Sequence, residues 1–128
     1  LQVEIAPGLP PLLSDAASLA QVLSELLNNA CKYTPEQGQI TISAVAVADS
    51  IEIRVTNTGV EIPANELSQV FDKFYRVPSA DPWKQGGTGL GLALVQKLVE
   101  HLGAAIAVVS GAGQTRFTVT LPHRPQLV

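Results

Sequence analysis

The chain has 128 residues, the length of one ordinary domain, and 46% of them are hydrophobic against 15% charged. This composition supports a packed core and argues against an intrinsically disordered chain. The net charge of −3 argues against a nucleic acid or an anionic membrane as the main partner, because both attract clustered lysine and arginine. The single cysteine, Cys31, excludes an internal disulfide. No apolar run approaches the roughly 20 residues that span a bilayer.

The N-terminal third is predicted to hold two short strands and one long helix. Residues 1–5 alternate as a strand, and 11–14 form a second candidate. Asp15 is a suitable N-cap, and apolar residues recur at helical spacing over 16–33. Because the chain begins inside a predicted strand, we expect it to be a piece of a longer protein.

The middle of the chain is predicted to form two strands, a short helix and a loop. Residues 40–47 and 51–56 read as strands, and the second alternates as a half-buried strand does. Pro63 can open a short helix that runs to about Val70. Residues 79–87 are polar and rich in proline and glycine, which predicts a long loop.

The C-terminal third is predicted to form a helix and a closing pair of strands. Residues 90–102 have helical spacing with an apolar face of three leucines, Leu94, Leu98 and Leu102. Residues 104–109 and 115–121 are predicted strands around a Gly-Ala-Gly turn. The order of elements predicts a single domain of the α/β class. We expect a two-layer α/β sandwich, in which one mixed, mostly antiparallel sheet of about five strands carries about three helices on one face.

One stripe of the long helix carries polar side chains away from its leucine face. Glu25, Asn29 and Lys32 recur at i, i+4 and i+7, so they share one side of the helix. The oxygens of Glu25 and Asn29 could ligate Mg²⁺, which prefers hard oxygen donors, and Lys32 could face a phosphate. On spacing alone, the alternative is a solvated helix face with a Glu–Lys pair.

A glycine-rich run, Gly86-Gly87-Thr88-Gly89-Leu90-Gly91-Leu92, leads directly into the last predicted helix. The free N–H groups of a helix start attract phosphate, and glycine lets a ligand approach the backbone. The run is not a P-loop, because no Lys-Ser or Lys-Thr follows, and no strand precedes it as in a dinucleotide-binding motif. A flexible loop with a helix cap is the alternative.

Four motifs in order resemble those of the catalytic ATP-binding domain of sensor histidine kinases. Residues 26–35 (LLNNACKYTP) resemble the N box, and 71–76 (FDKFYR) resemble the F box. Residues 87–92 (GTGLGL) resemble the second glycine box, and 113–117 (GQTRF) the closing glycine-threonine motif. The resemblance spans about residues 7–122, and four motifs in this order are more specific than any one of them.

This resemblance implies a fold, an activity and partners. The fold would be the Bergerat-type sandwich shared with gyrase, mismatch-repair and heat-shock-chaperone ATPases. The activity would be that of a protein-histidine kinase domain in a two-component system, which binds ATP and Mg²⁺. It would present the γ-phosphoryl to a histidine on an upstream dimerisation domain of the same protein, and a response regulator would be a further partner. We expect a cytoplasmic, monomeric fragment that makes no membrane contact and is inactive without the acceptor histidine.

The resemblance also implies a role for individual residues. Glu25 and Asn29 would be the catalytic pair and the Mg²⁺ ligands. Residues 76–88 would form a lid that closes over the nucleotide, with Trp83 as its anchor or as a nucleotide contact. The residues implied to bind the nucleotide are Asn29, Lys32, Tyr33, Asn57, Gly59, Ile62, Lys73, Arg76, Gly87, Thr88, Gly89, Leu90, Gly91, Leu92 and Thr115.

The first glycine box departs from the family pattern. The usual Asp-x-Gly-x-Gly is replaced here by Asn57-Thr58-Gly59-Val60-Glu61. Asn57 keeps an acceptor oxygen for the adenine amino group but loses the negative charge and adds donors of its own. The change is expected to weaken nucleotide binding without altering the fold.

Neither histidine of the chain fits the role of the phospho-acceptor. His101 falls late in the last predicted helix and His123 in the C-terminal tail, and neither belongs to a His-Glu or His-Asp motif. The acceptor is therefore expected on another segment. Two alternative functions stay open: a gyrase-like ATPase in which Glu25 polarises water, and a pseudokinase-like binding module with weakened nucleotide affinity.

Overall fold

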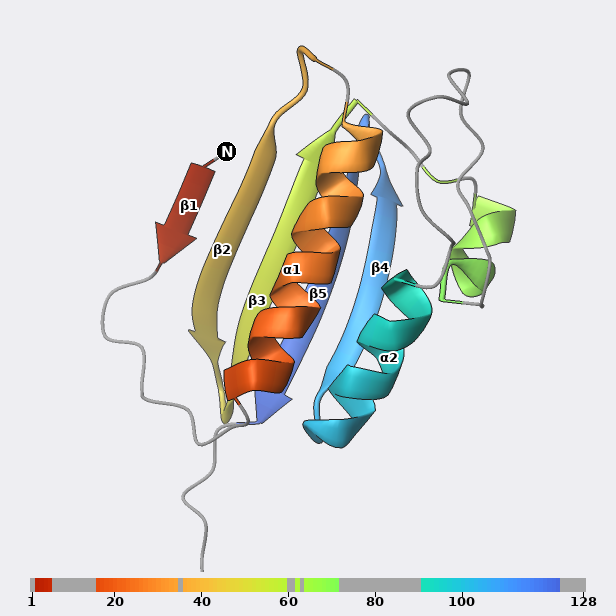
Figure 1. The fold of residues 1–128 in the computed structure, drawn as a ribbon. Helices are drawn as coiled ribbons and strands as arrows, with labels where there is room; N and C mark the ends of the chain where they lie inside the picture. Colours follow the sequence, from red (N-terminus) through yellow and green to blue (C-terminus); the bar gives the residue numbers. More distant parts are fainter. Residues whose placement is uncertain are drawn as a thin grey trace, which may run out of the picture.

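The computed structural model describes residues 2–5, 16–34, 36–59, 62, 64–71 and 91–122. These residues form five strands, two α-helices and one 3-10 helix (Figure 1). In chain order the elements are β1 (Gln2–Ile5), α1 (Ala16–Tyr33), β2 (Ile40–Val47), β3 (Ser50–Thr58), η1 (Ala64–Gln69), α2 (Gly91–His101), β4 (Ala105–Gly111) and β5 (Gln114–Pro122).

The five strands form one sheet in the order β1-β2-β3-β5-β4. β1 pairs with β2 in parallel, and the other three pairs are antiparallel. Tight turns join β2 to β3 and β4 to β5, and each turn contains an alanine with positive φ, Ala48 at 52° and Ala112 at 53°. The prediction of a mixed, mostly antiparallel sheet is confirmed.

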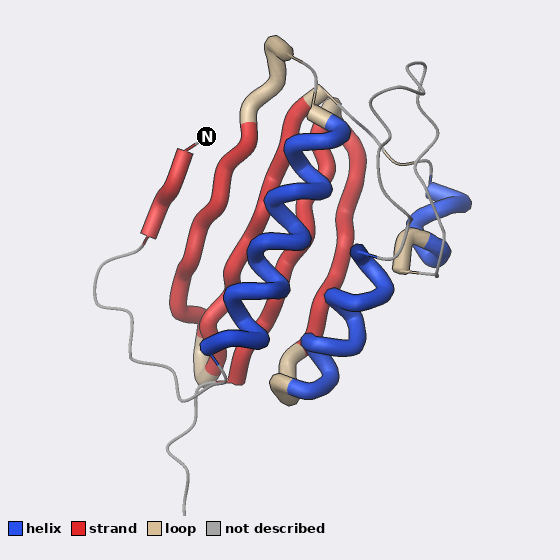
Figure 2. The backbone as a smooth tube through the Cα atoms, viewed as in Figure 1, coloured by secondary structure: helices blue, strands red, loops and turns tan. Residues whose placement is uncertain are grey.

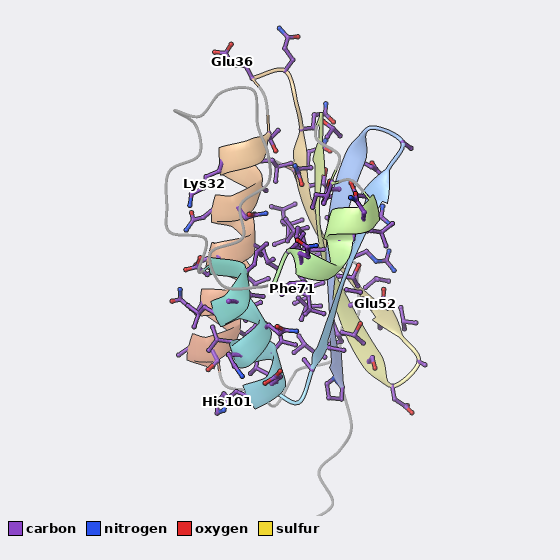
Figure 3. The ribbon with its side chains drawn as sticks, turned by 90° about the vertical axis from the view of Figure 1, so that its right-hand side faces the viewer. Lys32, Glu36, Glu52, Phe71 and His101 are labelled. Carbon is purple, nitrogen blue, oxygen red and sulfur yellow. The ribbon has the colours of Figure 1, made fainter. Side chains whose placement is uncertain are left out.

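The helices lie together on one face of this sheet, so that the molecule has two layers (Figures 2 and 3). The helices cover the side chains that the predicted strand alternation places on that face of the sheet. In β3 every second residue is buried, and β5 shows the same pattern. The core between the layers is formed by apolar side chains of both helices and three strands: Val22, Leu26, Ala30, Ala44, Ile51, Ile53, Val55, Val95, Val99, Phe117, Val119 and Leu121.

The boundaries agree with the periodicities to within about two residues, and β3 continues to Thr58, two residues beyond its predicted end. The helix predicted after Pro63 is a 3-10 helix rather than an α-helix, so the described part contains two α-helices and not three. β4 continues to Gly111, two residues beyond the predicted end. α2 begins at Gly91. The strand predicted at 11–14 lies outside the described residues.

The buried face of α2 also differs from the leucine face that we expected. Val95 and Val99 are buried, whereas Leu94 is 42% exposed. α2 packs against both α1 and β4, and its two valines belong to the core cluster that the helices share with the sheet. Leu98 and Leu102 lie at the edge of the same core. Two apolar stripes overlap on α2, and helical spacing alone does not tell which of them is buried. The packing of α2 against β4 as well as α1 determines which stripe is covered.

α2 ends in a glycine cap. The N–H of Gly103 donates to the carbonyl of Glu100 at 3.1 Å, and the N–H of Ala104 to that of Val99 at 3.0 Å. Gly103 has a φ of 66°, which glycine adopts without the Cβ penalty. No helix in the described part of the chain has the length and hydropathy required to traverse a bilayer.

We predict that Val95→Ala destabilises the domain and that Leu94→Ala does not. Val95 is fully buried between α2, α1 and the sheet, so the loss of two methyl groups and the resulting cavity should cost about 2 kcal/mol. Leu94 is largely solvated, and its truncation should cost less than about 0.5 kcal/mol. Urea unfolding of the two variants measures the difference. Equal losses would show that the leucine face is the packed one.

Candidate functional site

The helix-facing side of the sheet is apolar except along one row. In the described strands, its polar residues are Asn57 on β3, Thr115 on β5 and Ser110 on β4. Asn57 pairs with Thr115 across β3 and β5, and Thr115 pairs with Ser110 across β5 and β4. Asn57 is 4% exposed and Thr115 is 2% exposed. Three adjacent polar groups therefore interrupt the core at one end of the sheet.

Hydrogen bonds connect this row to the segment that follows β3. Ser110 Oγ accepts a hydrogen bond from the backbone N–H of Ile62 at 2.7 Å and lies 2.9 Å from Thr115 Oγ1. The N–H of Gly59 donates to the carbonyl of Gly113 at 2.8 Å. Gly59 of the first glycine box is thus held against the turn between β4 and β5, 54 residues later in the chain.

A second contact fixes the start of the same segment. The N–H of Thr58 donates to the carbonyl of Gln39 at 3.0 Å, and the N–H of Gln39 donates back to Thr58 Oγ1 at 2.8 Å. Gln39 directly precedes β2, so the first glycine box is tied to both of its neighbours in the sheet. Hydrogen bonds therefore hold Thr58 and Gly59 from both sides.

A small apolar cluster lies beside the polar row and joins three motifs. Ile62 and Val70 are its buried members. Phe71, the first residue of the F box, packs edge-on against the ring of Phe117, with ring centres 6.1 Å apart and planes at 82° (Figure 3). Leu92 of the second glycine box packs on the same cluster. Motifs separated by 20 to 50 residues therefore share one small core.

The polar stripe of α1 faces away from the main core. Glu25 and Asn29 are half-buried and Lys32 is exposed. Figure 3 shows Lys32 on the side of α1 that points away from the sheet. The spacing that predicted a shared stripe is therefore consistent with the observed exposure.

Glu25 lies against the first residue of α2. Its Oε1 accepts a hydrogen bond from Gln21 Nε2 at 3.0 Å. Its Oε2 lies 2.8 Å from the point where a Cβ on Gly91 would stand. Only a residue without a side chain permits this approach, so the second glycine box meets α1 at the residue directly before the N box.

The family of the chain follows from its match to known proteins. Residues 14–125 match the family described as histidine kinase-, DNA gyrase B-, and HSP90-like ATPase. The chain belongs to this ATPase family. It is 40% identical over 116 residues to the sensor histidine kinase WalK of Bacillus subtilis, and 42% identical over 120 residues to RcsC of Escherichia coli. These alignments cover 88% and 92% of the chain but only 19% and 12% of the relatives.

Solved structures of sensor histidine kinases share the fold. The mycobacterial sensor histidine kinase MprB superimposes with a TM-score of 0.84 at 29% identity, over 98% of this chain and 84% of that one. Full-length ShkA in complex with AMPPNP superimposes with a TM-score of 0.78 at 29% identity, over 98% of this chain and 27% of that one. The chain is thus a histidine kinase-type ATPase domain, as its four motifs indicated.

Several of the expected nucleotide contacts of this ATPase domain lie outside the described residues. They are Lys73, Arg76, Gly87, Thr88, Gly89 and Leu90, together with the lid expected over 76–88 and the side chain of Tyr33. Within the described part of the chain, the expected nucleotide-binding residues form two groups. One is Glu25 with Gly91, beside Asn29 and Lys32 on α1; the other is Asn57 with Thr115, Gly59 and Ile62.

Ser110 belongs to none of the motifs recognised in the sequence. The predicted strand ends at Val109 and the predicted turn covers 111–113, so Ser110 falls between the two. The signal was present in the alternation of Ile106, Val108 and Ser110, which continues the inner face by one more position. Extending the strand would have placed a serine beside Thr115 in this ATPase domain.

We predict that Gly91→Ala in this ATPase domain displaces the Glu25 carboxylate without unfolding the protein. The new Cβ meets the far end of a flexible side chain, which can move. The melting temperature should change little, and the Mg²⁺ dependence of ATP binding should weaken.

Gly103→Ala is the matched control for this substitution. A Cβ at residue 103 would have open space around it, but the φ of 66° strains an alanine by roughly 1–2 kcal/mol. This variant should melt earlier and bind Mg-ATP normally. Calorimetry and thermal melts compare the two, and normal Mg²⁺ dependence in Gly91→Ala would contradict the assignment of Glu25.

Proposed function

We propose that this domain binds ATP with Mg²⁺ and presents the γ-phosphoryl to a histidine on an upstream dimerisation domain of the same protein. The observation that carries the proposal is the chemical division of the site. One group of residues, around Glu25 and Lys32, is charged. The other, around Asn57 and Thr115, is polar, neutral and buried. A nucleoside triphosphate has the same division between its phosphates and its base.

The charged group suits the triphosphate. Glu25 and Asn29 supply hard oxygen donors on successive turns of α1, and two protein ligands are typical where Mg²⁺ keeps waters and phosphate oxygens. Bound there, the ion would neutralise charge on the phosphates. Lys32 would approach a phosphate from the exposed side of α1. The N–H groups at the start of α2 follow directly on the second glycine box, where an anion is stabilised.

The neutral group suits the adenine. Asn57 offers an amide oxygen to the adenine amino group, and Thr115 offers a hydroxyl beside it. Ile62 supplies an apolar surface for the base and is itself fixed by Ser110 and by the small core around Val70. The complex of the relative ShkA with AMPPNP supports an adenine nucleotide as the ligand.

The proposed reaction needs a nucleophile from outside the domain. The charged group contains a carboxylate, an amide and an ammonium, which position a phosphoryl group and stabilise its charge rather than attack it. His101 lies at the opposite end of α2 from Gly91, about 15 Å away for a helix of this length. The attacking imidazole is therefore assigned to the upstream domain, and the phosphoryl group would pass on to a response regulator.

We predict that the isolated domain binds Mg-ATP but acquires no stable phosphate and hydrolyses ATP negligibly. Addition of a separate domain that carries the acceptor histidine should produce labelled histidine. Asn29→Ala should abolish Mg²⁺-dependent binding and transfer with little change in melting temperature, because Asn29 lies outside the core cluster.

The possible results separate the three functions. Binding followed by transfer to the added domain supports the kinase, and phosphate release without an acceptor supports a gyrase-like ATPase. The absence of nucleotide binding supports a binding module. A large loss of thermal stability in Asn29→Ala would show that Asn29 is structural.

We predict that Asn57→Asp tightens ATP binding about five- to tenfold. A hydrogen bond to a charged acceptor contributes about 1.5–3 kcal/mol and a neutral one about 0.5–1.5 kcal/mol, so the carboxylate should gain roughly 1 kcal/mol. Calorimetry at matched salt and Mg²⁺ measures both proteins. Thr56→Ala, on the other face of β3, is the control and should bind as the parent does. Unchanged or weaker affinity in Asn57→Asp would show that the site has re-formed around the amide.

A further inference from the structure

Ser110 connects three parts of the chain through one oxygen atom. Its Oγ accepts the N–H of Ile62 at 2.7 Å, lies 2.9 Å from Thr115 Oγ1, and lies 3.4 Å from the carbonyl oxygen of Gln114. Ile62 comes 48 residues earlier in the chain. Ser110 is therefore the link between the segment after β3 and the β4–β5 hairpin at the neutral end of the site.

The hydrogen-bonding capacity of a hydroxyl limits how these contacts can be made. A serine has one proton and two acceptor lone pairs. The Ile62 N–H occupies one lone pair. If Ser110 donates its proton to Thr115 Oγ1, the Thr115 hydroxyl must point its own proton away from Ser110. If Ser110 donates to the carbonyl of Gln114, the Thr115 hydroxyl must donate to Ser110 Oγ. The shorter contact is the one to Thr115, and in both arrangements Ser110 restricts the direction of the Thr115 hydroxyl.

We propose that Ser110 is a positioning residue for the purine base, an inference that rests on the proposed ATP-binding function. It acts through two neighbours. It orients the hydroxyl of Thr115, which lies beside Asn57, and it holds the backbone of Ile62, whose side chain would contact the base.

The location of Ser110 makes this role specific to one end of the ligand. Ser110 lies on β4, and its hydroxyl contacts Ile62, Thr115 and Gln114, whereas Glu25, Asn29 and Lys32 lie on α1. Removing its hydroxyl should therefore weaken the recognition of the base and leave the binding of phosphates unchanged. A residue that only stabilises the fold would affect both ends equally.

The experiment compares ATP, inosine triphosphate and inorganic tripolyphosphate, each with Mg²⁺, as ligands of the 128-residue chain. In Ser110→Ala the affinity for ATP should fall about three- to tenfold, the effect of one neutral hydrogen bond. The affinity for tripolyphosphate, measured by competition, should stay within about twofold. The preference for ATP over inosine triphosphate should shrink, because without the Ser110 contact the direction of the Thr115 hydroxyl is less restricted and distinguishes an amino from an oxo group less well.

Three further variants make the result interpretable. Ser110→Thr retains the hydroxyl and should restore both the affinity and the preference. Ser110→Cys is close in size but forms weak hydrogen bonds, and it should reproduce the loss even if the alanine variant folds poorly. Ser43→Ala makes the same change on the outer face of β2 and should bind as the parent chain does.

Equal losses for ATP and tripolyphosphate, or an unchanged preference for ATP in both Ser110→Ala and Ser110→Cys, would overturn the proposal. A parent chain that binds tripolyphosphate and ATP equally well would instead overturn the assignment of the base to the Asn57 end. A parent chain that binds neither would overturn the proposed function itself.

Discussion

The sheet has one covered face, and every polar group on that face needs a partner. α1 and α2 bury the apolar residues of β3 and β5, where an unpaired hydroxyl or amide would cost roughly 1–3 kcal/mol. The row of Asn57, Thr115 and Ser110 interrupts this layer at its end, next to the segment that supplies Ile62. The neutral end of the site therefore lies at the edge of the apolar core, where hydrogen bonds between polar groups take the place of apolar packing.

The strand order explains how distant motifs meet. β3 lies between β2 and β5, so its C-terminal end is next to Gln39 on one side and to the β4–β5 turn on the other. The T-shaped contact of Phe71 with Phe117 then brings the first residue of the F box onto the same region of the sheet. Antiparallel pairing and the shared small core thus bring together described residues of three motifs that are separated along the chain, and the N box adjoins them through the packing of α1 against α2.

The sequence predicted the parts of the structure that depend on local patterns. The 3.6-residue periodicity of 16–33 predicted α1, and the alternation of Ile51, Ile53 and Val55 predicted the buried face of β3, although the predicted strand stopped one residue before Asn57. Features that depend on contacts with elements distant in the sequence were not predictable from local patterns. The choice of Val95 over Leu94 depends on the packing of α2 against both α1 and β4, and the role of Ser110 depends on a hydrogen bond to Ile62 that no local pattern encodes.

The contact of Glu25 with Gly91 makes two positions dependent on each other. The carboxylate occupies the space that any side chain at residue 91 would need. A larger residue at 91 can therefore be accommodated only if residue 25 becomes shorter or turns away. Asp at residue 25, shorter by one methylene group, would leave room for a side chain at residue 91. Variation at these two positions should accordingly be correlated, although they lie 66 residues apart in the chain and on different helices.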